Sequence, residues 1–211
     1  MATTYSQTRR SRRREETREE ALDHAVAIME AEGVGGLSIS EIARRMGIKP
    51  PSLYKYFPSL HAVYDALFAR GVRSQVAAME EAVATATTLP DRLRTGAVSI
   101  VRWCTDNPAL AQLVFHRPVP GFEPSPEAFA PSVASMAWLH EELAAGIADG
   151  VLRADTDTDE LVALYTATIS GLVAQHLANE PGTSFERGRF TSRTDLAIGR
   201  LLSHYLPGGT P

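Results

Sequence analysis

Cysteine is nearly absent from this 211-residue sequence, in which Cys104 is the only one. No disulfide can therefore form within the chain, which is typical of a reducing cytoplasm, and the cysteine pairs of zinc-binding modules are missing. No apolar run approaches the roughly 18 residues that a helix needs to cross a bilayer. The basic N-terminus is not followed by the apolar stretch of a signal peptide. We therefore expect a cytoplasmic protein without a membrane partner.

Motifs of known catalytic and cofactor sites are missing as well. His140 and Glu141 begin a pattern like that of a zinc protease, but Ala144 stands where the second histidine would be required. The chain has no nucleophile elbow of the Gly-x-Ser-x-Gly type and no phosphate-binding glycine loop. The sequence therefore predicts a protein that is not an enzyme, with no catalytic residue, no metal and no cofactor.

Charge is distributed unevenly along the chain. The formal net charge is −4, yet residues 1–75 contain 12 Lys and Arg against 9 Asp and Glu. A basic front and an acidic remainder indicate that the N-terminal part contacts a polyanion. Five arginines and few apolar residues predict a mobile basic tail over residues 1–14, which either only keeps the chain soluble or contacts nucleic acid. These arginines are Arg9, Arg10, Arg12, Arg13 and Arg14.

Apolar residues recur at helical spacing throughout, and no segment shows the two-residue period of a strand, so the predicted fold class is all-α. A first helix ends at the glycine-rich turn of residues 33–36. Ser38 and Glu41 form a capping box, with each side chain bound to the other's backbone N–H, that opens a short helix to Met46. Further helices are expected at 50–57, 60–84, 91–107, 109–115, 132–148, 157–178 and 191–206, with a proline-rich loop over 118–131.

Residues 38–57 have the spacing of a helix-turn-helix: a capped short helix, a turn at Gly47 and a second helix of barely two turns. Lys49, Ser52 and Lys55 are three residues apart and share one face, whereas Leu53 and Phe57 point into a small core. The residues that this pattern places at nucleic acid are Arg44, Arg45, Lys49, Ser52, Tyr54, Lys55 and Tyr56.

The stretch from Leu37 to Ser59, LSISEIARRMGIKPPSLYKYFPS, resembles the DNA-binding domain of the tetracycline-repressor (TetR) family. The resemblance covers residues 15–75 and implies an N-terminal three-helix domain followed, over residues 76–211, by a helical domain for ligand binding and dimerisation. It implies that Ser38, Ser52, Tyr54 and Tyr56 contact phosphates and that Lys49, Pro50, Pro51 and Lys55 lie nearest the bases. The chain departs from the family at Leu60, where a phosphate-binding lysine is usual.

The family also holds an effector between helices of its C-terminal domain. Apolar residues at helical spacing in this region are either ordinary core or the walls of such a pocket. The residues predicted to line it are Trp103, Leu110, Phe115, Met136, Leu139 and Tyr165. The proline-rich loop is the expected mobile wall, because long loops in compact domains are often functional. Apolar helices in an acidic region predict a largely apolar effector, neutral or cationic.

The last two helices are predicted to pair with a second copy in a four-helix bundle of two-fold symmetry. Gly171 and Gly199 would allow a close approach of helices. The alternative is that the same stripes pack on their own subunit. The predicted contact residues are Leu161, Leu164, Thr168, Ile169, Leu172, His176, Leu196, Gly199, Leu202 and Leu206.

Together these features predict a ligand-responsive transcriptional regulator, in the first instance a repressor, that binds double-stranded operator DNA as a homodimer and responds to a small-molecule effector. An activator fits the sequence too. The alternative hypothesis is a helical protein-interaction module whose helix-turn-helix no longer binds DNA. Leu60 and the acidic total are the observations that favour this alternative.

Overall fold

The computed structural model describes the backbone of residues 2–208 and the side chains of residues 11–208, and this part of the chain contains helices and no strand. The predicted all-α class is thus confirmed. Two short 3₁₀ turns occur at Val34–Gly36 and Thr191–Arg193, and a π-turn occurs at Gln112–His116. The α-helices are α1 (Ala2–Glu32), α2 (Ile39–Arg45), α3 (Pro50–Leu53), α4 (Leu60–Val83), α5 (Leu89–Asp106), α6 (Pro108–Ala111), α7 (Pro126–Ala148), α8 (Thr158–Asn179) and α9 (Thr194–Tyr205).

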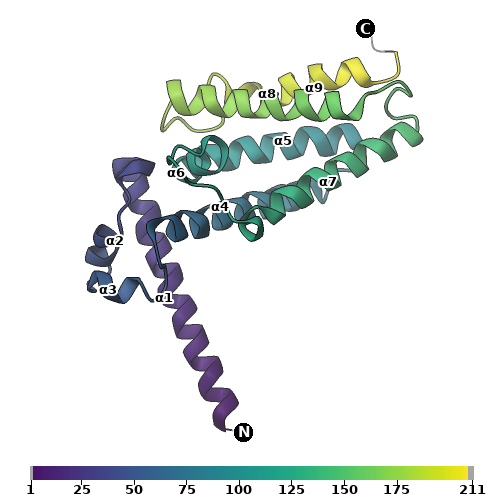
Figure 1. Cartoon of the computed structure of the whole chain (residues 1–211). Helices are drawn as coiled ribbons and strands as arrows, with labels where there is room; N and C mark the ends of the chain where they lie inside the picture. The colour runs from purple at the N-terminus through teal and green to yellow at the C-terminus, as the bar shows by residue number, and fades with distance from the viewer. Residues whose placement is uncertain (1, 209–211) are drawn as a thin grey trace.

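Helices α1, α2 and α3 form a small unit on the first turns of α4. Its centre consists of apolar side chains, such as Ile42, Leu53 and Phe57, that are almost completely buried. The Tyr64 hydroxyl donates a hydrogen bond of 2.8 Å to the Val34 carbonyl and so joins α4 to the turn after α1. Helix α4 continues from this unit into the larger bundle and therefore links the two parts mechanically (Figure 1).

The larger part is a bundle in which α8 and α9 lie side by side over α5, with α4 and α7 on the other side (Figure 1). The Tyr165 hydroxyl of α8 donates to the Leu93 carbonyl of α5 at 2.7 Å. Helix α7 passes close to the start of α5 at Gly146, where an added Cβ would lie 2.2 Å from Leu89 Cδ2. The bundle is therefore closely packed at the end farther from the small unit.

The predicted helix starts agree with the caps in the structure. The Ser38 hydroxyl accepts from the Glu41 amide at 3.1 Å, and the Ser59 hydroxyl accepts from the Ala62 amide at 3.1 Å. Gly47 adopts φ +68°, the left-handed conformation that ends α2. The capping box is only half formed, however, because the Glu41 carboxylate binds arginines instead of the Ser38 amide.

The N-terminal segment differs from the predicted mobile tail, because α1 begins at Ala2 and runs without a break to Glu32. Arg and Glu are good helix formers, and Arg12 pairs with Glu16 one turn later at 3.1 Å. Arg9 and Arg10 lie outside the residues whose side chains are described. The prediction of a structureless tail is therefore wrong for the backbone, whereas a contact with DNA stays a prediction.

The proline-rich loop is shorter than predicted, because α7 begins at Pro126 and includes Pro131. Pro126 occupies the first turn, where its missing N–H would have no intrahelical partner, whereas Pro131 lies inside the helix and leaves one backbone hydrogen bond unmade. Ser125 caps this helix, and Asp65 of α4 accepts from both the Ser125 amide (2.6 Å) and its hydroxyl (2.9 Å). The start of α7 is therefore set by a residue 60 positions away.

Helix α8 is apolar as well as long. Its 22 residues would be long enough and apolar enough to cross a membrane if length and composition were the only criteria, and a third of its most apolar window is buried in the bundle. The expectation of no such run therefore does not hold for α8. An apolar core helix passes the same test, and the face that α8 leaves open is described below.

Candidate DNA-binding surface and ligand cavity

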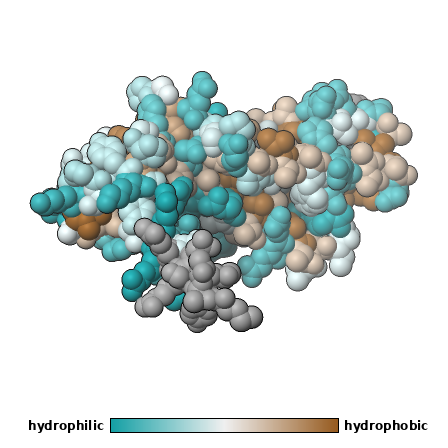
Figure 2. Space-filling view, turned by 60° about the horizontal axis from the view of Figure 1, so that its bottom comes forward, coloured by the Kyte–Doolittle hydropathy of each residue, from teal (hydrophilic) through white to brown (hydrophobic). Residues whose placement is uncertain are grey.

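Helix α3 presents polar side chains on a surface supported by a small core. Lys49 caps its start without a side-chain hydrogen bond, and Pro50 and Pro51 occupy its first turn. Tyr54 is 51% exposed and Lys55 is exposed beside it, whereas Leu53 and Phe57 are buried beneath. Residues of hydrophilic character predominate at this end of the molecule, on the left in Figure 2. Tyr54 and Lys55 are therefore free to reach a ligand of DNA size.

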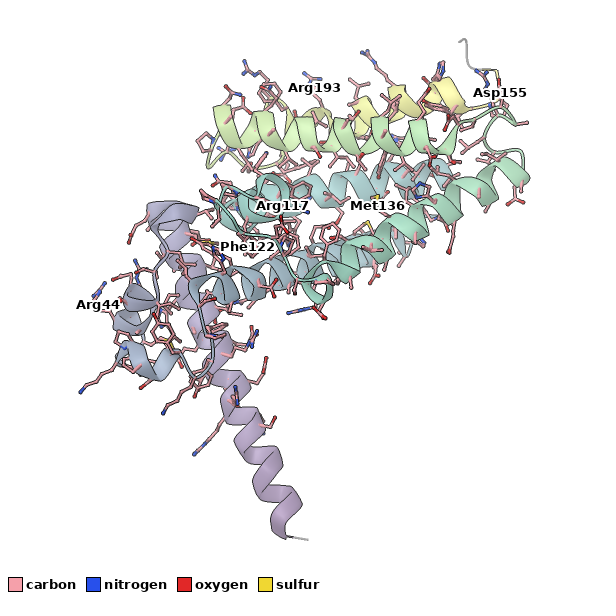
Figure 3. The ribbon with its side chains drawn as sticks, viewed as in Figure 1. Arg44, Arg117, Phe122, Met136, Asp155 and Arg193 are labelled. Carbon is pink, nitrogen blue, oxygen red and sulfur yellow. The ribbon has the colours of Figure 1, made fainter. Side chains whose placement is uncertain are left out.

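Arg44 and Arg45, which end α2, share one acidic partner. Glu41 accepts two hydrogen bonds of 2.7 Å from Arg44 and one of 2.9 Å from Arg45. The hydrogen bonds from Arg44 and then Arg45 lower the pKa of Glu41 to about 2. Arg45 also pairs with Glu32 of α1 at 3.3 Å, so both of its ion pairs lie within the unit that α1, α2 and α3 form. Arg44 points outward into solvent (Figure 3) and keeps its outer edge open.

Two arginines of α1 support the segment that follows α3: sequence reasoning gave Arg14 only as part of the basic tail and did not single out Arg18. The Arg14 guanidinium donates to the Lys55 carbonyl at 3.2 Å and lies 6.0 Å from the centre of the Tyr56 ring. The Arg18 guanidinium lies 5.0 Å from the centre of the Phe57 ring. These contacts place the basic segment of α1 directly beside the polar surface of α3, and only the tertiary structure brings them together.

The arginines before Arg14 give a testable prediction. A variant that lacks residues 1–13 keeps Arg14 but loses four positive charges. If these arginines bind DNA, the slope of log affinity against log salt should fall by about 0.9 for each phosphate that is no longer neutralised. Filter binding between low and physiological salt measures the slope. An unchanged slope would show that these charges only keep the chain soluble.

A cavity of about 280 Å³ lies in the larger bundle, between α4, α5, α7, α8 and the π-turn. Four of the six residues predicted for a pocket line it, namely Phe115, Met136, Leu139 and Tyr165. Met136 is labelled in Figure 3, on α7 opposite α5. Most other walls are apolar and come from Val76, Met79, Leu93, Gly96, Ile100, Val114, Trp138 and Ile169, while the remaining polar walls are Gln75, Arg92, Ser132, Ser135, Thr166 and Ser170.

Trp103 and Leu110 are not among the residues that line this cavity. Both are buried in the core, and the Trp103 indole N–H donates to the Ser74 hydroxyl at 3.1 Å. Their predicted place in the pocket is corrected, because apolar helical spacing does not tell a cavity wall from solid core. The polar walls, above all Gln75 and Arg92, were missed for the converse reason, since an apolar period carries no information about polar side chains.

One wall of the cavity packs directly against α4. Val114 packs against α4 so closely that a Cβ on Gly71 would lie 2.9 Å from Val114 Cγ2. The segment from the π-turn to α7 then folds back over the first turns of α4. There Phe122 packs its ring 5.8 Å from that of Tyr64 and 6.4 Å from that of Phe68. Cavity walls and the small unit therefore meet on the same helix.

Arg117 holds this connection in an unusual conformation. It is the single non-glycine residue with positive φ, +44°, among residues 2–208. Its guanidinium lies 5.8 Å from the Phe68 ring centre and 5.2 Å from that of Phe129, so it bridges α4 and α7. Strained backbone of this kind is retained where its surroundings hold it in place. Arg117 and Phe122 lie between the small unit and the bundle (Figure 3).

The predicted dimer stripes divide between two faces. Four of their members are buried within their own subunit: Leu161, Ile169, His176 and Leu202. These four side chains pack within their own subunit and are not available to an interface, because the predicted stripe is broad and only one edge of it is left open. Leu164 and Leu196 are instead 44% and 46% exposed. Thr168, Leu172, Gly199 and Leu206 are partly exposed, and no side chain approaches Gly171.

Chemically reactive groups are few in the described part of the chain. Residues 11–208 contain no group of three His, Cys, Asp or Glu side chains that is arranged to hold a metal ion. Burial raises the pKa of Cys104 well above its ordinary value, which keeps the thiol protonated. The structure thus offers surfaces and a cavity for binding, and we assign no reaction to them.

Helices α2 and α3, with the turn at Gly47 between them, have the arrangement of a helix-turn-helix. Residues 21–67 match the family described as "Bacterial regulatory proteins, tetR family". A relative from Bacillus subtilis, "Uncharacterized HTH-type transcriptional regulator YobS", is 33% identical over 67 residues, or 32% of this chain and 35% of that protein. "HTH-type transcriptional regulator Rv1816" from Mycobacterium tuberculosis is 29% identical over 146 residues, or 66% of this chain and 58% of that protein.

Solved structures show the same fold over nearly the whole chain. FadR from Bacillus subtilis, solved "in complex with stearoyl-CoA", aligns with a TM-score of 0.73 at 18% identity and covers 88% of this chain and 97% of that one. Such a low identity shows a shared fold. The match of residues 21–67 to the family and the regulators among the relatives assign a TetR-type DNA-binding domain to the N-terminal part of the chain, and the shared fold agrees with this assignment.

Proposed function

We propose that this chain is a ligand-responsive repressor that binds operator DNA as a homodimer in the cytoplasm. The observation that carries the proposal is the surface of α3, where Tyr54 and Lys55 stand exposed on the buried Leu53 and Phe57. Helix α3 is too short to fill a major groove by itself. We therefore interpret it as the recognition helix of a helix-turn-helix, in which α2 supports it.

The DNA contacts divide into two kinds. The hydroxyls of Ser38, Ser52, Tyr54 and Tyr56 are proposed to bind phosphates, which position the protein, while Lys49, Pro50, Pro51 and Lys55 lie nearest the bases. Arg44 contributes through its outer edge, and Arg45 through its support of α2. Leu60 cannot provide the phosphate contact of the usual lysine, and we propose that the arginines of α1 replace it.

The dimer is proposed to form through the open faces of α8 and α9. Leu164 and Leu196 provide exposed apolar side chains, and Gly171 lets a partner helix approach. Thr168, Leu172, Gly199 and Leu206 border the same faces. Two helices from each subunit then form an isologous four-helix bundle. This arrangement also accounts for the apolar side chains that α8 presents to solvent in a single subunit.

Ligand response is proposed to pass from the cavity to α4. A molecule that fills the cavity presses on Val114, which is packed against Gly71, and on α7, which Ser125 caps. Since Asp65 binds Ser125 and Phe122 packs on α4, α4 and the small unit then shift together. A changed spacing of the two α3 helices no longer fits successive major grooves. FadR, which shares the fold, holds stearoyl-CoA.

The test is a gel-shift assay on the DNA that lies upstream of the chain's own coding sequence, with an equal length of unrelated DNA as competitor. Specific operator binding predicts a retarded complex that resists the competitor. The alternative function, a protein-interaction module whose helix-turn-helix no longer binds DNA, predicts no retarded complex. The acidic total charge and Leu60 are the observations that favour the alternative.

A further inference from the structure

One polar side chain stands out among the apolar walls of the cavity. Gln75 lies on α4 and lines the cavity, and its amide nitrogen Nε2 is fully buried with no hydrogen-bond partner among the described residues. Buried N–H donors in folded proteins are nearly always paired, because an unpaired donor has lost its hydration without replacement. The Gln75 amide is therefore an unused donor, buried in the wall of the cavity.

Two hydroxyl donors of the cavity wall already have partners within the protein. The Tyr165 hydroxyl donates to the Leu93 carbonyl at 2.7 Å, and the Thr166 hydroxyl donates to the Val162 carbonyl at 2.8 Å. Serine hydroxyls can rotate toward the carbonyls of their own helix. Among the described residues that line the cavity, Gln75 is the one with a fully buried side-chain donor that lacks a partner.

The cavity carries no free charge that would attract an ion. Arg92 is its one charged lining residue within the described part of the chain. Its Nε and Nη2 lie 2.7 and 2.6 Å from one carboxylate oxygen of Glu142, which neutralises it. A buried ion without a counter-charge is strongly unfavourable. An anion would have to displace Glu142, and a cation would find no open carboxylate on these walls.

Size and access set the shape of the occupant. An apolar cavity of about 150 Å³ holds benzene, so about 280 Å³ holds a molecule of roughly two rings. A second hollow, about 470 Å³, opens between α4 and α7 and shares Val76, Met79, Ser135 and Trp138 with the cavity. These shared residues mark the path by which a molecule reaches Gln75.

We infer that the effector is a compact, neutral, mostly apolar molecule whose carbonyl or similar acceptor oxygen binds the Gln75 amide. The inference rests on the proposed ligand response and specifies the class of molecule that produces it. Composition alone predicted a largely apolar effector that is neutral or cationic. The paired Arg92 and the absence of an open carboxylate on the described walls exclude a charged head group, so only a neutral effector remains.

Four bicyclic probes of nearly equal size test the inference on the free full-length protein. They are 1-tetralone, which has a carbonyl acceptor, tetralin, which has none, the anion 1-tetralincarboxylate and the cation 1-aminotetralin. Calorimetry or ligand-observed NMR gives each affinity. We expect 1-tetralone to bind about tenfold more tightly than tetralin, which is the effect of one hydrogen bond to a buried donor, and both ions to bind more weakly than tetralin.

Gln75→Leu keeps the volume of the side chain but removes its donor. We expect this variant to bind 1-tetralone and tetralin equally, with a Tm equal to or above that of the wild type, because an unpaired buried donor is removed. A residue with a merely structural role would lower the Tm instead. Ser135→Ala, on the opposite wall, and Gln112→Leu, outside the cavity lining, are the matched controls and should keep the wild-type preference.

Several outcomes would overturn the inference. Equal binding of 1-tetralone and tetralin by the wild type, or no binding of any probe, would show that Gln75 anchors nothing of this class. Tightest binding of the carboxylate, abolished in Arg92→Met, would assign an anion site. A preference retained in Gln75→Leu would place the anchor elsewhere. Because no DNA is present, these results stay interpretable even if the gel shift fails.

Discussion

The double variant Leu164→Glu, Leu196→Glu should be a folded monomer that no longer binds operator. Both side chains are nearly half exposed in the single subunit, so the substitutions leave its core intact. In the proposed four-helix bundle they would bury four carboxylates near the two-fold axis, and unpaired buried charges are strongly unfavourable. Two linked half-site contacts can exceed one by 10²–10⁴ in affinity, so operator binding should fall by about a hundredfold or more.

Sedimentation at micromolar concentration measures the oligomeric state, and a gel shift measures operator affinity. Val133→Glu is the matched control, because it places the same charge on an exposed apolar residue of α7, away from α8 and α9. It should remain dimeric and bind DNA normally. A double variant that sediments as a dimer would show that copies associate through another surface.

The double variant Tyr54→Phe, Lys55→Ala should lose operator binding without loss of stability. Tyr54→Phe removes a hydroxyl proposed to bind phosphate, and should weaken binding to every sequence alike. Lys55→Ala removes a side chain proposed to lie at the bases, which should cost about 1–3 kcal/mol and relax specificity. Both residues are exposed, so thermal unfolding of the free protein should not change.

Affinities for a panel of operator variants separate the two effects. Arg73→Ala is the control for charge, because Arg73 is exposed on α4 about 20 Å by helical rise from the start of that helix. It should leave specificity unchanged. If the folded double variant binds its operator like the wild type, the assignment of α3 as the DNA-facing helix is wrong.

The helix-turn-helix was predictable because its signals are local. Ser38 and Ser59 cap helices three residues ahead of their bonded amides, Gly47 supplies a left-handed residue, and Leu53 and Phe57 share one face at a spacing of four. Each signal acts within one or two helical turns, so a window of sequence contains all of its physics. The predicted tail over residues 1–14 was wrong although its signals are local too. The arginine-rich composition was given more weight than helix-forming pairs such as Arg12 and Glu16.

Contacts between distant residues were not predictable in this way. The start of α7 depends on Asp65, and the orientation of the α1 arginines depends on aromatic residues about 40 positions later. The cavity differs from solid core only in the fit of several helices, so Phe115 and Tyr165 lie at it whereas Trp103 and Leu110 do not. In the same way, the stripe predicted for the dimer contact contained both Leu164, which is exposed, and Leu161, which is one turn away and buried.

The sequence by itself determined the all-helical class and the helix-turn-helix, because caps, turns and apolar periods are set by neighbours along the chain. The tertiary structure decided which face of α8 is open, which apolar residues surround a cavity, and that Gln75 and the neutralised Arg92 belong to its walls. These features arise from packing between helices far apart in sequence, and packing depends on shapes and distances that a linear pattern does not contain.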